Sequence, residues 1–338
     1  MILFLGNILG KHDFNPTYLE LLSGDLKHYP ICTVSHYKNK YFRLIHMVVV
    51  FYRHIFSTKL VVIDTYSTFA FNFALIMSFI SRWHRKPYIL NLSGGDLENR
   101  LINSKSFKTI LYHSTLNISP SRFIFEKLQQ HNFQSLYIPN YLNLDLYPYY
   151  RRTSFSPKIL WVRSFHKIYN PEMAIEVLKL VKKKYSNCNL CMVGPFKDDS
   201  IVHVRALSKK YKLNSYLDLT GKISKKKIIK ISKDFDFFIN TTNFDNLPIS
   251  VLEAMALGLP IISTNVGGLP FFLNEANSIL VNKNDSVAMA NAIIQIIEAP
   301  QFGTGLSESA RETVKESHNK KIIIKKWSKI FDSYLQQG

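Results

Sequence analysis

The sequence has few cysteines, and their number and context limit what they can do. Its 338 residues include three, Cys32, Cys188 and Cys191. Three cysteines cannot form a fully paired disulfide framework, which favours a reducing compartment. Cys188 and Cys191 form a C-x-x-C pattern, but the apolar run 188–193 alternates as a strand does, and a zinc site would need two more ligands nearby. We therefore interpret both as core cysteines.

Long hydrophobic runs are also absent. The N-terminal run 1–6 lacks a basic n-region and is too short for a signal peptide, so we expect a first buried strand there. The most apolar later stretch, 69–80, is interrupted by Asn72 and Ser78 and is shorter than the ~20 residues that a spanning helix needs. We predict no transmembrane helix and a cytoplasmic protein.

Acidic residues are scarce relative to basic ones. Lys and Arg number 43 against 24 Asp and Glu, which gives a formal net charge of +19. Such a charge attracts nucleotide diphosphates, nucleic acid or the anionic inner leaflet of a membrane. Nucleic-acid binding would need basic side chains interleaved with aromatic stacking residues, or a recognised module, and the sequence has neither. We therefore expect no nucleic-acid partner.

The basic residues fall into groups that we interpret differently. Short Lys runs, such as 182–184 and 225–227, are typical of a solvated helix surface. The segment 38–53 combines basic residues with aromatic ones and is a candidate surface for peripheral attachment to anionic lipid. An ordinary core helix is an equal alternative for that segment.

Short apolar runs alternate with amphipathic helical patterns along the chain, as in parallel sheets with crossover helices. We predict strands at 1–5, 60–63, 88–92, 117–118, 136–138, 158–162, 190–193, 217–219, 237–240 and 260–263, and helices at 172–185 and 249–257. Residues 140–157 have little periodicity and are interpreted as a linker. The sequence thus predicts two doubly wound α/β domains. The first comprises 1–150 with a returning helix at 322–338, and the second 156–321.

The most informative stretch is 240–260, NTTNFDNLPISVLEAMALGLP. We expect a strand to end at its start and a helix to begin near Leu247, with Asn246 as N-cap and Pro248 in the first turn. Gly258 would end the helix. The backbone N–H groups of the first turn, at the positive end of the helix dipole, would suit a diphosphate.

Two carboxylates bracket this turn. Asp245 precedes the helix and Glu253 lies in its second turn. A carboxylate can accept hydrogen bonds from both hydroxyls of a vicinal diol, so one could hold a sugar and the other the ribose of a nucleotide sugar. The alternative is an Asp that complements the helix dipole and a Glu on a solvated face.

An acidic residue, seven intervening residues and a Glu, followed by AMALGLPIISTNVGGLP, resemble the E-x7-E signature of glycosyltransferase family 4. The resemblance covers most of 158–300 and implies a retaining enzyme of GT-B fold, with two Rossmann-like domains facing a central cleft. It implies that Glu253 binds the donor ribose and that Asp245 contacts sugar hydroxyls. The backbone amides after Asp245, at Asn246, Leu247 and Pro248, would contact sugar and phosphate. Pro248 has no N–H to donate. Asp in place of Glu is shorter by one bond, about 1.5 Å, which bears on the identity of the sugar.

Other family positions can be carried over in the same way. The family's diphosphate-binding Arg falls on Arg163, after strand 158–162. Its Lys has two candidates, Lys197 and, slightly less favoured, Lys167, and either could be an ordinary surface cation. Gly221 and Ile223 match a turn whose backbone contacts the base, although a plain turn has a similar pattern.

The first half carries weaker signals. Gly10 in the loop 6–11, and Gly94 and Gly95 after strand 88–92, resemble glycine loops on the acceptor side. Ser93 stands where many relatives carry a histidine, so no role of that histidine is carried over.

The triplet 234–236, Asp-Phe-Asp, matches a D-x-D metal motif only superficially. It precedes a strand, at the wrong end of the sheet for a ligand, so we interpret it as a helix–strand junction. We expect no metal cofactor.

The sequence therefore predicts a retaining glycosyltransferase of the hexosyltransferase type. It would transfer a sugar from a nucleotide-sugar donor to a glycan or lipid-linked acceptor, in cell-surface polysaccharide or lipopolysaccharide biosynthesis. Asp245, Arg163 and Lys197 are the predicted catalytic residues, because positive charge would stabilise the departing nucleoside diphosphate. The alternatives are a GT-B nucleotide-sugar epimerase and, from a different class, a basic nucleic-acid-binding protein.

Overall fold

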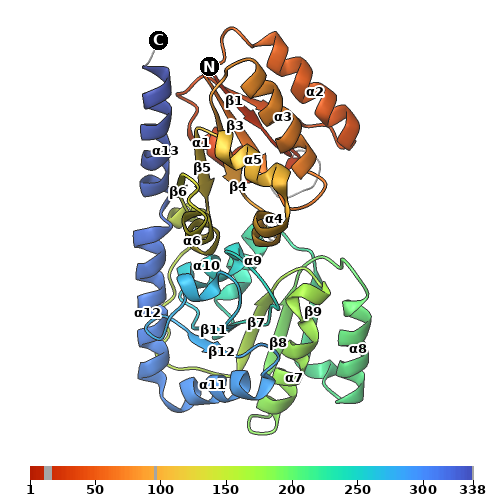
Figure 1. Cartoon of the computed structure of the whole chain (residues 1–338). Coiled ribbons are helices and arrows are strands. Elements are labelled where there is room, and N and C mark those ends of the chain that lie inside the picture. The colour runs from red at the N-terminus through yellow and green to blue at the C-terminus, as the bar shows by residue number, and fades with distance from the viewer. Residues whose placement is uncertain (11–16, 95–96, 337–338) are drawn as a thin grey trace. The chain divides into compact units, whose positions relative to one another are not determined.

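The computed structural model describes residues 1–10, 17–94 and 97–336, and the chain folds into two compact units (Figure 1). Unit 1 comprises Met1–Asn140 and Lys321–Gly338, and unit 2 comprises Tyr141–Lys320. Each unit is a six-stranded parallel sheet with crossover helices. The prediction of two doubly wound α/β units is confirmed.

Unit 1 has the strand order β2-β1-β3-β4-β5-β6. Its strands are β1 (Ile2–Leu5), β2 (Ile31–Val34), β3 (Leu60–Thr65), β4 (Tyr88–Leu92), β5 (Leu116–Ser119) and β6 (Ser135–Tyr137). Its helices are α1 (Tyr18–Asp25), α2 (Lys40–Arg53), α3 (Phe71–Trp83), α4 (Leu97–Asn103), α5 (Lys105–His113), α6 (Arg122–Gln130) and α13 (Lys320–Leu335). The central strands are buried on both faces, which is why they appear as continuous apolar runs.

The C-terminal helix α13 packs within unit 1. Trp327 and Phe331, one turn apart, are fully buried. The Trp327 Nε1–H donates to the hydroxyl of Tyr18 at 2.9 Å, and the Phe331 ring lies 5.9 Å from that of Phe4. The C-terminal helix therefore contributes to the same hydrophobic core as the N-terminal strand and helix.

Unit 2 has the strand order β12-β11-β10-β7-β8-β9. Its strands are β7 (Lys158–Val162), β8 (Asn189–Val193), β9 (Leu217–Gly221), β10 (Phe237–Asn240), β11 (Ile261–Thr264) and β12 (Ile279–Val281). Its helices are α7 (Pro171–Lys182), α8 (Ser200–Lys210), α9 (Lys225–Ser232), α10 (Ile249–Ala256), α11 (Ser286–Glu298) and α12 (Pro300–Ser317). The strand order reverses between β7 and β10, and such a point is where doubly wound sheets bind ligands.

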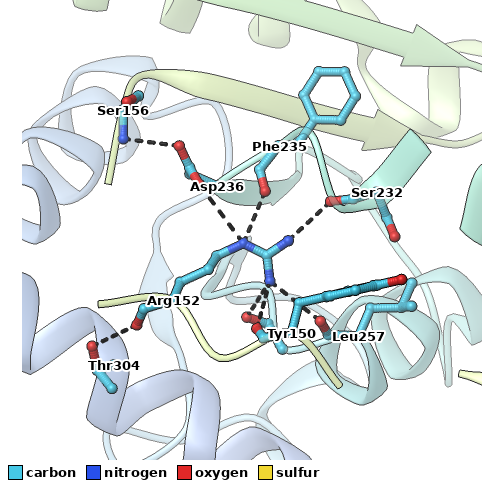
Figure 2. Close-up of polar contacts among 9 residues, drawn as sticks. Tyr150, Arg152, Ser156, Ser232, Phe235, Asp236, Leu257 and Thr304 are labelled. Carbon is cyan, nitrogen blue, oxygen red and sulfur yellow. Dashed lines mark hydrogen bonds and ion pairs between the residues drawn. The ribbon is translucent and has the colours of Figure 1, made fainter. Parts of the chain in front are cut away.

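The segment interpreted as a linker is packed into unit 2. Tyr147 and Arg152 are buried, at 3% and 7% exposure. The Arg152 guanidinium donates to the carbonyl groups of Ser232, Phe235, Tyr150, Leu257 and Gly258, and it pairs with Asp236 (Figure 2). Because these partners are mostly backbone carbonyls, the segment folds without the side-chain periodicity by which a helix or strand is recognised.

The helices and the cysteines of the structure bear on two of the predictions made from the sequence. Within residues 1–10, 17–94 and 97–336, none of the helices has the length and apolar character needed to cross a bilayer. Cys188 and Cys191 are buried in the core of unit 2 and are not disulfide-bonded, so their interpretation as core cysteines is confirmed.

Candidate active site

Arg163 and Asp245 form an ion pair where the strand order of unit 2 reverses. Arg163 follows β7 and Asp245 lies in the loop after β10, and these two strands are neighbours in the sheet. Both side chains are largely buried, at 13% and 17% exposure. The guanidinium also lies 4.7 Å from the centre of the Tyr169 ring. Its Nε is buried and has no hydrogen-bond partner in the part of the chain that the structure describes.

The loop that carries Asp245 is fixed on one side by hydrogen bonds to the loop that carries Arg163. The Thr241 hydroxyl donates to the carbonyl of Tyr169 at 2.8 Å and accepts from Nε1 of Trp161 at 2.9 Å. The backbone N–H of Asn243 donates to the carbonyl of Ile168 at 2.7 Å. The two predicted site residues are therefore held by connected backbone segments.

Two consecutive glycines fix the other side of the Asp245 loop. A Cβ on Gly267 would lie 2.2 Å from the carbonyl oxygen of Asp245, and one on Gly268 would lie 1.9 Å from that of Asn246. The N–H of Gly268 donates to the Asp245 carbonyl at 2.8 Å. Only residues without a side chain allow this approach, which explains the Gly-Gly pair at these positions.

Helix α10 begins later than the sequence suggests. It starts at Ile249 with Pro248 as its N-cap, not near Leu247 with Asn246 as the cap. Proline disfavours the helical conformation in the residue before it, which keeps Leu247 out of the helix. The N–H groups of the first helical turn therefore begin at Ile249 and Ser250, whereas Asn246 and Leu247 belong to the preceding loop. Gly258, with φ +77°, follows the helix end as predicted.

Glu253 lies on α10 and is buried, with 8% exposure. Its Oε1 accepts a hydrogen bond of 2.9 Å from the hydroxyl of Tyr147 and pairs with the ammonium group of Lys225. Burial, together with the Glu253 charge, raises the pKa of Tyr147 far above its usual value. Sequence patterns gave no indication of either partner. Tyr147 comes from the segment interpreted as a linker, and Lys225 from a Lys run interpreted as solvated surface.

Both candidate lysines lie on loops that are tied together after β7 and β8. The backbone N–H of Lys167 donates to the Asp198 carboxylate at 2.8 Å, and that of Lys197 donates to the carbonyl of Phe165 at 3.0 Å. The side chains of both lysines are exposed. A Cβ on Gly194 would lie 1.8 Å from the carbonyl oxygen of Arg163, so the β8 loop approaches the arginine closely.

Gly221 and Ile223 lie at the end of the neighbouring strand. Gly221 is the last residue of β9, with φ +66°, and its carbonyl accepts from the N–H of Gly194 at 3.0 Å. Ile223 is partly buried against the α9–α10 side of the core. The turn predicted to contact a base is therefore hydrogen-bonded to the loop that approaches Arg163.

The candidates in unit 1 lie in loops after the strands of its sheet. Gly10 donates its N–H to Glu20 at 2.8 Å, and a Cβ on Gly94 would lie 2.5 Å from the backbone nitrogen of Ser67. Gly95 lies outside the described residues.

Ser93, next to Gly94, donates to the buried carboxylate of Asp64 at 2.7 Å. The same carboxylate accepts from Tyr66 and Asn91. Burial raises the pKa of Asp64 despite these hydrogen bonds. The cluster thus gathers around one carboxylate at the carboxyl end of the unit 1 sheet.

The D-x-D triplet lies between α9 and β10, as interpreted from the sequence. Asp236 accepts a hydrogen bond of 2.9 Å from the backbone N–H of Ser156 and pairs with Arg152. It precedes β10, whereas Asp245 follows it, so the two carboxylates lie at opposite ends of the strand.

The chain is similar to known proteins in both sequence and fold. The family model "Glycosyl transferases group 1" matches residues 152–315. An uncharacterized glycosyltransferase of Methanocaldococcus jannaschii is 27% identical over 177 residues, which are 52% of this chain and 45% of that protein. The alpha-monoglucosyldiacylglycerol synthase of Acholeplasma laidlawii is 24% identical over 219 residues, 59% of this chain and 54% of the synthase. The matched part thus spans about half the length of these curated relatives.

A solved structure extends the similarity of fold to both units. The structure of Anabaena HepE in complex with UDP and glucose superposes with a TM-score of 0.76 at 15% sequence identity. The match covers 98% of this chain and 99% of HepE.

Proposed function

We propose that this chain belongs to the glycosyl transferases group 1 family, whose model matches residues 152–315, and that it is a retaining hexosyltransferase that uses a nucleotide-sugar donor. The observation that carries the proposal is the Arg163–Asp245 pair beside the start of α10, where Glu253 lies on the same helix. A cation, free helix amides and two carboxylates are what a sugar diphosphate ester requires.

We propose that unit 2 binds the donor. Its diphosphate would accept hydrogen bonds from Arg163 and from the N–H groups of Ile249 and Ser250, with Lys197 or Lys167 as a further cation. The diphosphate would compete with Asp245 for Arg163, and Asp245 would then accept hydrogen bonds from sugar hydroxyls. Contacts of Arg163 and Asp245 with the donor would thus replace the ion pair between these two residues.

Glu253 is proposed to bind the ribose. Both of its contacts use Oε1, so in the described part of the chain Oε2 remains to accept from the ribose hydroxyls. Gly221 and Ile223, in the turn after β9, are proposed to contact the base through their backbone. HepE binds UDP, and uridine is therefore the first base to test.

In the proposed reaction the sugar C1–O bond to the diphosphate breaks while the acceptor oxygen bonds to C1 from the same face. The acceptor proton passes to a phosphate oxygen of the departing nucleotide. Arg163 and the lysine stabilise the charge that develops on the diphosphate, which is where electrostatic catalysis is most effective.

The acceptor is proposed to be a glycan or a lipid-linked acceptor, bound by unit 1 through the loops that contain Gly10, Gly94 and Gly95. The pathway would be cell-surface polysaccharide or lipopolysaccharide assembly, at the cytoplasmic face of the membrane. The similarity to a synthase of glucosylated diacylglycerol supports an acceptor at a lipid surface.

The decisive experiment is a thermal-shift screen of the full chain with UDP-, GDP- and ADP-sugars, followed by assay of nucleotide release with and without acceptor. Stabilisation by one donor and acceptor-dependent release would support the proposal. Release of a free epimerised sugar without acceptor would identify an epimerase instead. A melting temperature unchanged by every donor would refute donor binding.

A further inference from the structure

Helix α2 exposes an apolar stripe where a helix of this kind usually has polar residues. Its core-facing side carries Arg43, Met47 and Phe51, spaced four residues apart and buried. Its outward side carries large apolar or aromatic side chains with exposures between 49% and 62%, namely Tyr41, Phe42, Ile45, Val49 and Tyr52. Helix α2 therefore packs against the core by one side and exposes apolar side chains on the other.

Helix α3 lies beside α2 (Figure 1). Exposed aromatic side chains on and next to α3 extend the stripe. The Tyr41 ring lies 6.5 Å from that of Phe69, just before α3, and the Tyr52 ring lies 5.2 Å from that of His84, just after it. Further exposed residues join at the same elements, with exposures of 63%, 74% and 99%: Phe79, Trp83 and Phe56. We call these nine apolar residues and the cations around them the α2–α3 face: Tyr41, Phe42, Ile45, Val49, Tyr52, Phe56, Phe69, Phe79 and Trp83.

The chain segment that carries the α2–α3 face, residues 26–94, has many basic residues and almost no acidic ones. The only carboxylate in residues 26–94 is Asp64, which is buried at 3% exposure. The same stretch contains nine basic residues, Lys27, Lys38, Lys40, Arg43, Arg53, Lys59, Arg82, Arg85 and Lys86. Lys38, Lys40, Arg53, Arg82 and Arg85 are exposed. The face therefore combines apolar insertion with attraction for an anionic surface.

We propose that the α2–α3 face docks on an anionic lipid bilayer. Aromatic side chains suit the boundary between headgroups and acyl chains, and exposed cations are attracted by anionic headgroups. Two copies of this face would repel each other because both are basic, which disfavours self-association through it. The proposal of membrane docking does not depend on the proposed glycosyl transfer. The further inference that docking brings unit 1 to a lipid-linked acceptor does depend on that activity.

The test is sedimentation of the full chain with vesicles of phosphatidylcholine alone and of phosphatidylcholine with phosphatidylglycerol. We expect binding to the anionic vesicles, weakened by salt. The triple variant Ile45→Ser, Val49→Ser, Phe56→Ser should lower the bound fraction about tenfold or more. A matched control replaces three exposed apolar residues of unit 2, Val202→Ser, Val287→Ser and Phe302→Ser, and should bind as the unaltered chain does. Melting temperatures of all three proteins check that each is folded.

Three results would overturn the docking proposal. These are equal binding to neutral and anionic vesicles, unchanged binding of the triple variant, and a concentration-dependent dimer that the triple variant abolishes. A parallel assay separates docking from catalysis. With a water-soluble acceptor the triple variant should keep the turnover of the unaltered chain, whereas with an acceptor in anionic vesicles its turnover should fall. Vesicle binding without any turnover would refute the proposed transfer and leave docking standing.

Discussion

Asp245 and Arg163 neutralise each other across the strand-order reversal of unit 2, although they lie in loops from different strands. Each is mostly buried, so each would be costly without a partner of opposite charge. A bound diphosphate would supply a new partner for the arginine, and a bound sugar would supply donors for the carboxylate. The pair would therefore couple the diphosphate end of the proposed donor to its sugar end.

Replacing Arg163 with Ala should lower kcat about 100-fold or more, because a charge that stabilises the leaving diphosphate is lost. Steady-state kinetics with the donor found in the thermal-shift screen provide the measurement. The matched control replaces Arg205, an exposed arginine on α8, with Ala, and its kcat should be close to that of the unaltered chain. A near-normal rate for Arg163→Ala would remove this residue from the phosphate site.

Asp245→Asn should separate nucleotide binding from sugar transfer. The variant loses the charge that holds Arg163, so UDP without its sugar should bind as well as, or better than, it does to the unaltered chain. Transfer should fall about tenfold or more, since a charged acceptor for the sugar hydroxyls is lost. Titration calorimetry with UDP and turnover assays test the two parts, and weaker UDP binding would contradict the competition between Asp245 and the diphosphate.

Glu253→Gln should weaken UDP binding about tenfold or more, because hydrogen bonds to a carboxylate are stronger than those to an amide. Tyr147→Phe should weaken it less, since this hydroxyl only positions the carboxylate. Calorimetry with UDP measures both, and Glu308→Gln, on exposed helix surface, is the control. Unchanged affinity of Glu253→Gln would refute the ribose assignment.

Arg151 and Arg152 provide a matched pair for stability. Arg152→Ala should lower the free energy of unfolding by about 3 kcal/mol, because several buried carbonyl groups lose their donor. Arg151→Ala should change it little, since its ion pair with Glu308 is exposed. Urea unfolding followed by circular dichroism gives both values, and equal effects of the two changes would contradict the role given to Arg152.

Asp198 should contribute to acid sensitivity. Hydrogen bonds from Ser200 and from the backbone N–H of Lys167 lower the pKa of Asp198 from 3.8 to about 2. A pKa depressed by folding stabilises the protein above the unfolded value, and this contribution is lost as the pH falls toward the folded one. Between about pH 5 and pH 2, the melting temperature of Asp198→Asn should therefore fall less than that of the unaltered chain. The difference should be small because the carboxylate is partly exposed, and a steeper fall for the variant would reverse the assignment.

The sequence was most informative where strands are buried on both faces. The predicted ranges 158–162 and 237–240 coincide with β7 and β10, because continuous apolar runs leave no alternative. Strands β2 and β12 were missed, whereas the edge strands β6 and β9, which also have partly exposed residues, were predicted. At the site, the sequence located Arg163 and Asp245 but could not indicate that they pair, because pairing depends on strand order.

The partners of Glu253 were beyond sequence reasoning for a different reason. Tyr147 is 106 positions away in the chain and lies in a segment without periodicity. Lys225 belongs to a run that is otherwise solvated, and only its position at the start of α9 brings it to the carboxylate. The start of α10 was placed too early because Pro248 acts as the cap and not as the first residue of the helix.

Helix α10 has only eight residues, and a peptide of that length would fray in water. In the protein its last carbonyl groups are held by two guanidinium groups, since Arg311 donates to Ala256 and Arg152 to Leu257. Anchored at that end, the two turns keep their first amides preorganised before any anion arrives. Binding a phosphate there would consequently require no ordering of this backbone, so that entropic cost would not be subtracted from the affinity.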